Sequence, residues 1–314
     1  MKKIIGLIGV IALVAGAVLF GTNFTKARAA AKEEVKTVTT DVNDEFQNIN
    51  IDIDTSDLII KKSDNGLTKV ECAETEKIFH EVKVEDGTLK VIQNDTRKWT
   101  ESLFNFFYNE LKVTIYLGET DFNNLNILVS TGYIDVAKEL TFKTAEIKGS
   151  TGDVSIRAKV LDSINVNLST GRITFEETNT KNLFVKASTG IVNLKSITVE
   201  EKTTINVSTG DIYLSDLTSG KINISSSTGD LFLTNVIAND DIIIKTSTGD
   251  VIFDHSDAQS LNIETSTGDV RGSFLTPKTF IISADIKHVD VPKTNGGFCD
   301  IKTDTGRIKI TIVE

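Results

Sequence analysis

One aspartate recurs at a fixed place in a short repeated phrase, Ser-Thr-Gly-Asp, and its carboxylate is the group best placed to do chemistry. Four consecutive copies carry it, at Asp211, Asp230, Asp250 and Asp269. If the copies stack, their like charges repel unless they are hydrated, bonded to backbone amides or bridged by a cation. Calcium prefers such oxygen ligands, but calcium-binding solenoids use several ligands per turn. We therefore favour carboxylates that accept backbone N–H bonds at a bend, and keep a calcium ladder as the alternative.

Other catalytic groups do not gather in the sequence. The histidines stand alone, without metal-ligand spacing or a Ser or Cys partner pattern: His80, His255 and His288. A polysaccharide-cleaving solenoid needs carboxylates in one groove, whereas the outward carboxylates fall in different copies, at Glu176, Asp254 and Glu264. We expect a protein that is not an enzyme and uses no cofactor. The alternative is a carbohydrate-active enzyme that acts on an envelope polysaccharide.

A second candidate site is an exposed apolar strip. Three successive copies carry Tyr213, Phe232 and Ile252 three positions after the glycine, where other copies have mostly polar residues. One interpretation is packing of these side chains on one another, which stabilises a sheet. The other is a docking strip for glycan rings or a partner protein.

The spacing of the phrase predicts stacked coils. Its glycines follow one another at intervals of 19 or 20 residues, at Gly132, Gly152, Gly171, Gly190, Gly210, Gly229, Gly249 and Gly268. Gly306 comes 38 residues later, which is two intervals, and Lys287 occupies the skipped position. Apolar residues alternate on both sides of each glycine, so two strands meet at a corner where glycine can adopt positive φ. Lys287 predicts strain or a different turn.

We predict an all-β fold in which residues 121–314 form a parallel β-solenoid with about 19–20 residues per coil. Ten coils run from Gly132 to Gly306, stacked in chain order. The alternative is a meander of antiparallel hairpins. We disfavour it because the same residue types recur at the same position of each repeat, which indicates that equivalent residues of successive coils lie on one another. The final strand, 308–313, has no evident cap, so end-to-end self-association is open.

Residues 45–120 are predicted to form an irregular β cap. Residues 46–61 resemble a first coil whose corner has lost its glycine, and Asp86-Gly87 indicates a hairpin. Residues 96–110 interrupt the pattern with a cluster of aromatic residues, Trp99, Phe104, Phe106, Phe107 and Tyr108. This cluster is either a plug over the core of the cap or an apolar surface for a partner or the membrane.

The start of the chain indicates export. Lys2 and Lys3 precede an apolar run, so residues 1–29 are interpreted as a signal peptide or a helical membrane anchor, and residues 30–44 as a tether. Both alternatives place the remainder outside the cytoplasm, anchored to the cell membrane or on the cell surface. The net charge of −10 argues against nucleic-acid binding. Cys72 and Cys299 are interpreted as buried apolar residues, too far apart in a rod for a disulfide.

The export segment, the start Ile51-Asp52-Ile53-Asp54-Thr55-Ser56 and the train of Ser-Thr-Gly-Asp corners resemble the putative-adhesin domain family. This domain of unknown function occurs in bacterial envelope proteins, including LiaG-like ones linked to cell-envelope stress. The resemblance covers about residues 45–314, and it implies a surface β-solenoid without catalytic residues to transfer. We expect a non-catalytic binding or structural protein, such as an adhesin, a scaffold or a stress sensor, whose partner is an unidentified envelope glycan or protein.

Overall fold

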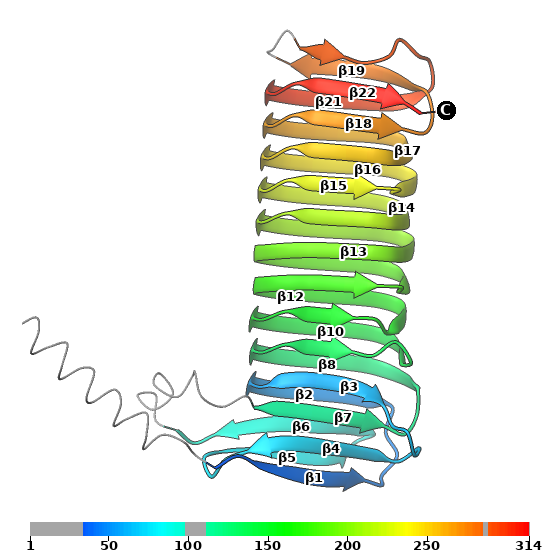
Figure 1. Cartoon of the computed structure of the whole chain (residues 1–314). Helices are drawn as coiled ribbons and strands as arrows, with labels where there is room; N and C mark the ends of the chain where they lie inside the picture. The colour runs from blue at the N-terminus through cyan, green and yellow to red at the C-terminus, as the bar shows by residue number, and fades with distance from the viewer. Residues whose placement is uncertain (1–33, 98–110, 285–287, 314) are drawn as a thin grey trace, which may run out of the picture.

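The computed structural model describes residues 34–97, 111–284 and 288–313 (Figure 1). Every regular element in these ranges is a strand, and the strands β1 to β22 join one sheet. The described residues include no helix long and apolar enough to cross a membrane. The predicted export segment 1–29, the aromatic cluster from Trp99 to Tyr108, and Lys287 lie outside the described residues.

The body of the molecule is a parallel β-solenoid of about nine turns. Strand β8 (Asp121–Thr131) pairs in parallel with β10 (Thr141–Thr151), β10 with β12 (Lys159–Glu176), and β12 with β13 (Asn179–Thr209). The pairing joins residues one repeat apart, as at Leu125 and Ala145. The stack continues through β9 (Ile134–Val136), β11 (Val154–Ile156), β14 (Ile212–Thr228), β15 (Leu231–Thr234), β16 (Ile237–Thr248), β17 (Val251–Thr267) and β18 (Val270–Phe274). The predicted solenoid is confirmed, and the antiparallel meander is wrong.

The core runs along the inside of the rod. Residues that alternate inward before and after the corner are buried in each coil, as are Ile164, Val166, Ile173 and Phe175. In the later coils the inward position three residues before the glycine carries a buried hydroxyl, at Ser226, Thr246, Thr265 and Thr303. The Thr265 and Thr303 hydroxyls donate to the carbonyls of Gly249 and Gly268, so backbone groups at the corners satisfy them.

Glycine is required at the corners for two reasons. Gly210 has a φ of 134°, which side chains rarely adopt, and a Cβ atom there would lie 1.7 Å from the carbonyl oxygen of Gly190 in the preceding coil. The backbone N–H of Gly210 donates to the carbonyl of Thr228 in the next coil, at 2.8 Å. Successive coils therefore approach at the corner more closely than any side chain would allow.

In five successive coils, a second bend follows six residues after the corner glycine, at a position that the sequence analysis did not assign. Its residues adopt left-handed φ values between 49° and 55°: Glu177, Ser196, Asp216, Asn235 and His255. Asn and Asp tolerate this conformation better than most residues, but Glu and Ser mark it less clearly. The signal in the sequence was therefore weak.

At the N-terminal end, chain order and stacking order differ. Strands β2 (Asn48–Thr55) and β3 (Asp57–Lys62) stack in parallel on β8 and β9, which confirms them as a coil without a corner glycine. On their other side they pair with β6 (Thr88–Asp95) and β7 (Lys112–Leu117), also in parallel. The coil of β6 and β7 therefore lies outside the β2–β3 coil, although it comes later in the sequence (Figure 1).

Antiparallel strands complete this end. Strand β4 (Thr68–Glu74) pairs with β7 and with β1 (Lys36–Val42), and β5 (Ile78–Glu85) forms with β6 the hairpin predicted at Asp86-Gly87. Strand β1 differs from the tether predicted over residues 30–44. Its threonine and valine residues suit an edge strand, and all seven of its residues pair with β4.

The C-terminal end also changes order. Strand β21 (Gly297–Thr305) pairs with β17 on one side and with β19 (Lys278–Ala284) on the other. Strand β22 (Ile308–Ile312) likewise lies between β18 and β20 (Val289–Asp290). The last coil of the chain is thus inserted beneath the coil that precedes it, as Figure 1 shows.

Two predictions for this end are wrong. The ten coils do not stack in chain order, because the coil of Gly306 lies directly on that of Gly268. The final strand is not fully open, because β20 pairs with its first two residues, Ile308 and Lys309. The outermost coil is instead the one with β19 and β20, and it is flanked by both prolines of the sequence, Pro277 and Pro292. Proline has no N–H to offer another chain, so it suits such an edge.

Candidate functional site

The recurring aspartates form a ladder of hydrogen bonds along the corner. The carboxylate of Asp211 accepts the backbone N–H of Asp230 at 2.9 Å, and that of Asp230 accepts the N–H of Asp250 at 2.8 Å. Asp250 and Asp269 continue the series, each at 2.8 Å, to the N–H groups of Asp269 and Arg307. Each carboxylate therefore fixes the start of the next coil.

The second oxygens of these carboxylates have different partners, and that of Asp211 accepts the Tyr213 hydroxyl at 3.3 Å. Asp269 pairs with the Arg307 guanidinium at 2.8 Å, and Asp250 lies 3.6 Å from that of Arg271. The backbone N–H of Arg307, followed by its guanidinium, holds the pKa of Asp269 below its usual value. This geometry fits carboxylates that accept backbone N–H bonds at a bend. Calcium binding by Asp211, Asp230, Asp250 and Asp269 stays a prediction.

The structure brings the residues of the apolar strip together, as predicted from their common position three residues after the corner glycine. Tyr213 lies opposite Phe232, and Phe232 opposite Ile252, on three adjacent coils. The two rings are stacked with centroids 4.8 Å apart and planes 3° from parallel. Their facing sides cover each other, so the ring edges point outward, and Tyr213 stays 38% exposed. Asn193 and Arg271 continue the row on either side, so the strip has polar ends.

The outward carboxylates do not form a catalytic pair. Glu176 and Asp254 occupy the same phase but lie four coils apart, about 19 Å at the usual strand spacing. Glu264 lies before its corner and pairs with Lys302 at 3.1 Å and Lys245 at 3.6 Å. Glycosidase carboxylates lie about 5–10 Å apart, so Glu176 and Asp254 are too far apart to act as a dyad.

One hollow gathers other carboxylates near the N-terminal end. It has a volume of about 520 Å³ and is lined by Asp52, Asp54 and Asp95, together with Lys148 and the corner hydroxyl of Ser150. Asp95 is held by Arg97, whose guanidinium lies 2.5 Å from it. Carboxylates gathered in one hollow are what the alternative, a carbohydrate-active enzyme, would need.

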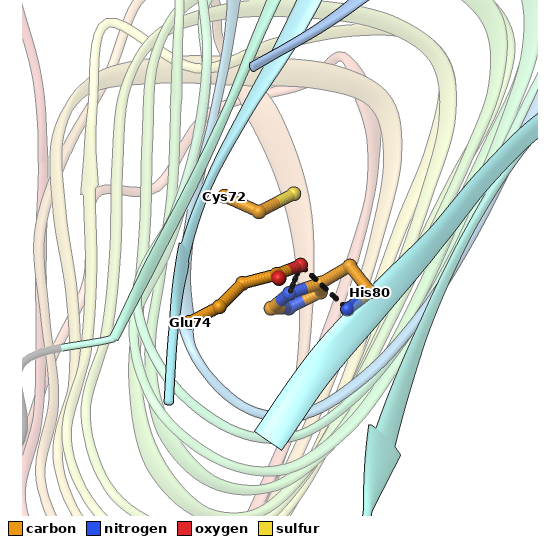
Figure 2. A group of neighbouring side chains, drawn as sticks. All are labelled: Cys72, Glu74 and His80. Carbon is orange, nitrogen blue, oxygen red and sulfur yellow. Dashed lines mark hydrogen bonds and ion pairs between the residues drawn. The ribbon is translucent and has the colours of Figure 1, made fainter. Parts of the chain in front are cut away.

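The sequence analysis missed a buried group in the cap, formed by Cys72, Glu74 and His80 (Figure 2). One oxygen of Glu74 accepts the backbone N–H of His80 at 2.7 Å and lies 3.2 Å from its Nδ1. The expectation that His80 stands alone is therefore wrong. The signal was present, since Cys72 and Glu74 share one face of a strand and His80 lies on the next strand.

Burial shapes the chemistry of these groups. It raises the pKa of the Cys72 thiol to about 12, and it lowers the pKa of His80 although Glu74 opposes the shift. Cys299, in the last coil, is also buried, and its pKa is raised to about 12 by burial. Both cysteines are free, in agreement with their interpretation as buried residues without a disulfide.

The sequence matches the family model described as Toastrack DUF4097 over residues 46–212 and 200–314. The chain belongs to this family. No curated protein matches the sequence. The Toastrack family gives the fold that the strand pairing shows, and it agrees with the expected domain of unknown function.

Solved structures share this Toastrack architecture. One, described as a putative lipid binding protein from Parabacteroides distasonis, is 18% identical with a TM-score of 0.50, and the match covers 89% of this chain and 98% of that one. A putative adhesin from the same species is 13% identical with a TM-score of 0.51, covering 86% and 98%. A putative adhesin from Parabacteroides merdae is 13% identical with a TM-score of 0.51, covering 90% and 98%. At these identities the likeness concerns the fold.

Proposed function

We propose that this Toastrack protein is a non-catalytic surface protein of the bacterial envelope that binds a protein partner through the side of its rod. The observation that carries the proposal is the strip of Tyr213, Phe232 and Ile252. In the described part of the chain, three successive coils carry apolar side chains at this outward position, with Tyr213 exposed and Phe232 and Ile252 partly buried. The descriptions of structural neighbours as putative adhesins support a binding role.

The orientation of the rings favours a protein over a glycan. Sugars bind to aromatic side chains mainly through the ring faces, but the faces of Tyr213 and Phe232 that meet are covered by each other. The outward ring edges can instead pack against apolar side chains of a partner. Arg271 at one end and the Asp211 carboxylate, 3.3 Å from the Tyr213 hydroxyl, would set the register with charged groups of that partner.

A photocrosslinking experiment tests this proposal. A photoreactive amino acid at Ile252 of the full chain should crosslink to one envelope protein, and the same group at Ser155, the equivalent position on another coil, should not. Replacing both rings, Tyr213→Ser with Phe232→Ser, should abolish the crosslink. The matched control replaces Thr174 and Asn193, at the same phase, with Ser. Circular dichroism verifies that each variant is folded.

Two results would overturn the proposal. One is a crosslink at Ile252 that survives the double replacement, and the other is the absence of any crosslink specific to Ile252. In either case the strip would serve only the packing of neighbouring coils.

The finer role and the location belong to the same proposal. We infer attachment to the cell membrane through residues 1–29, with the rod outside the cytoplasm as an adhesin, a scaffold or a LiaG-like stress sensor. Fractionation of cells that carry the full chain, followed by protease treatment of intact cells, tests the location. Protection of the rod from external protease, in cells without an outer barrier, would contradict it.

A further inference from the structure

The cap contains a buried group of side chains with the chemistry of metal ligands. Cys72 and Glu74 point inward from β4, and His80 points inward from β5 of the adjoining hairpin (Figure 2). One ligand atom from each of the three residues lies within 4.8 Å of the others. Sulfur, imidazole nitrogen and carboxylate oxygen are the three donor types that zinc binds in proteins.

The hydrogen bonding of His80 leaves one nitrogen available. An ionised Glu74 can only accept hydrogen bonds, so the Nδ1 atom of His80, 3.2 Å from it, carries the proton. The Nε2 atom then holds a free lone pair, and it is buried without a hydrogen-bond partner. The imidazole itself is fully buried. Buried polar atoms are nearly always paired, so this unpaired acceptor needs an explanation.

A bound cation supplies that explanation. Metal-binding histidines commonly donate their other N–H to a carboxylate, which fixes the tautomer and turns the lone pair toward the metal. Glu74 has this relation to His80, and the Cys72 sulfur lies on the same inward face. We propose that Cys72 and His80 bind a thiophilic divalent cation, represented by Zn²⁺, with Glu74 as the residue that orients His80.

The binding step is balanced by the loss of one proton. The Cys72 sulfur forms a bond to Zn²⁺ as its thiol proton passes to solvent, and His80 binds through Nε2 without a change in its own protons. Ligand atoms of one zinc ion lie roughly 3.5 Å apart, given bond lengths of about 2.0–2.3 Å. Side-chain rotations of Cys72 and His80 would have to bring the sulfur and Nε2 to that spacing, and water would complete the coordination.

A hollow lies beside this group, on the side of Glu74. Its volume is about 400 Å³, and its lining includes Glu34, Glu76 and Glu74 itself, together with Lys36, which lies 3.9 Å from Glu34. Glu74 therefore lies both in the wall of the hollow and beside His80. The three carboxylates outnumber the one lysine, so the opening favours cations over anions.

Cobalt titration of the full chain tests the site, because Co²⁺ bound to a thiolate absorbs in the near ultraviolet. We expect such a band at one equivalent of Co²⁺, and its loss when Zn²⁺ is added. Cys72→Ser and His80→Gln should weaken Zn²⁺ binding at least about 100-fold in competition with a chromophoric chelator. Glu74→Gln should weaken it by about 10–100-fold, as expected for an orienting carboxylate.

Cys299→Ser is the matched control, because Cys299 is equally buried and free but lies in the last coil. This variant should keep the cobalt band. The proposal is overturned if the reduced, folded wild-type chain shows no band and no stoichiometric zinc. It is also overturned if the band survives Cys72→Ser or disappears with Cys299→Ser. The wild-type titration remains decisive even if a cap variant fails to fold.

Discussion

The middle of the rod and its two ends are built from similar coils but differ in the relation between sequence and stacking. From β8 to β17, each coil lies on the one that precedes it in the chain. At each end, two coils exchange places, so β2–β3 lies inside β6–β7 and β21–β22 lies inside β19–β20.

This exchange places regular coils inside and irregular coils outside. The C-terminal outer coil ends in a two-residue strand, β20, and is flanked by Pro277 and Pro292. On the outer side of the N-terminal outer coil, β4 pairs with β7 and β1 pairs with β4, both in antiparallel orientation. Regular coils expose unpaired backbone groups at an open end and invite association. At each end of the rod, therefore, a less regular coil covers the backbone groups of a regular one.

The largest expected effect comes from removing a coil in each region. Deleting residues 191–210 removes one interval between two corner glycines, so the rod should remain folded and shorten by about 4.8 Å.

Deleting residues 297–314 removes the coil that joins β17 to β19, so the C-terminal coils should unfold and bind an apolar dye. Scattering measures the length, and urea unfolding measures the stability. Equal urea midpoints for the truncated and full chains would contradict the inserted coil.

The next largest effect should come from breaking a buried ion pair near the C-terminal end, where the last two coils exchange places. Asp257 lies 2.5 Å from the amine of Lys278, and both side chains are at most 10% exposed. Asp257→Ala leaves this lysine buried without its charge partner and should lower the free energy of unfolding by about 3–5 kcal/mol. Asp241→Ala, in the exposed pair with Lys221, should lower it by less than about 1 kcal/mol. Similar losses of unfolding free energy in Asp257→Ala and Asp241→Ala would show that the buried ion pair is no more important than the exposed one.

The middle of the rod should depend on its corner glycines. Gly210→Ala would place a Cβ atom against the Gly190 carbonyl at a backbone conformation unsuited to alanine. We expect a loss of roughly 3 kcal/mol, from backbone strain and overpacking together. Ser208→Ala, at an exposed position of the same corner, should change stability by less than about 0.5 kcal/mol. Urea unfolding compares the two, and an equally stable Gly210→Ala chain would show that the corners can separate.

The smallest effect concerns pH at the joint between Gly268 and Gly306. The pKa of Asp269 is lowered in the folded chain by Arg307, so its ionised form stabilises the fold above the unfolded pKa of about 3.9. That contribution is lost as the pH falls through the lower folded-state pKa. Asp269→Asn should lose roughly 1 kcal/mol at neutral pH, and the difference from wild type should vanish in acid. Urea midpoints against pH test this, and parallel curves would contradict it.

The difference between the middle of the rod and its ends also determines how much of the fold could be predicted from the sequence. In the middle, the interval between Gly132 and Gly268 specifies both the coil and its neighbours, because chain order equals stacking order. At the C-terminal end, the 38 residues before Gly306 were interpreted as two steps up the stack, but the structure shows one. A period measures length along the chain, and it carries no information on which coil lies outside.

The candidate sites divide in a similar way. The strip of Tyr213, Phe232 and Ile252 follows from phase alone, because parallel coils place equal phases side by side. The group of Cys72, Glu74 and His80 depends on the antiparallel cap, where the β4–β5 turn sets which residues meet. The spacing of Glu74 and His80 matches no metal-binding motif, so only their inward alternation could have indicated it.

The inserted last coil also has a mechanical consequence. Strands β21 and β22 are hydrogen-bonded to neighbours on both sides. In a simple solenoid, tension on the final strand would peel it from a single neighbour, one bond at a time. Here the same tension on β22 has to break its ladder with β18 and its short pairing with β20, and then both ladders of β21. A rod loaded from this end should therefore resist unravelling, because the inserted coil is held by neighbours on both sides.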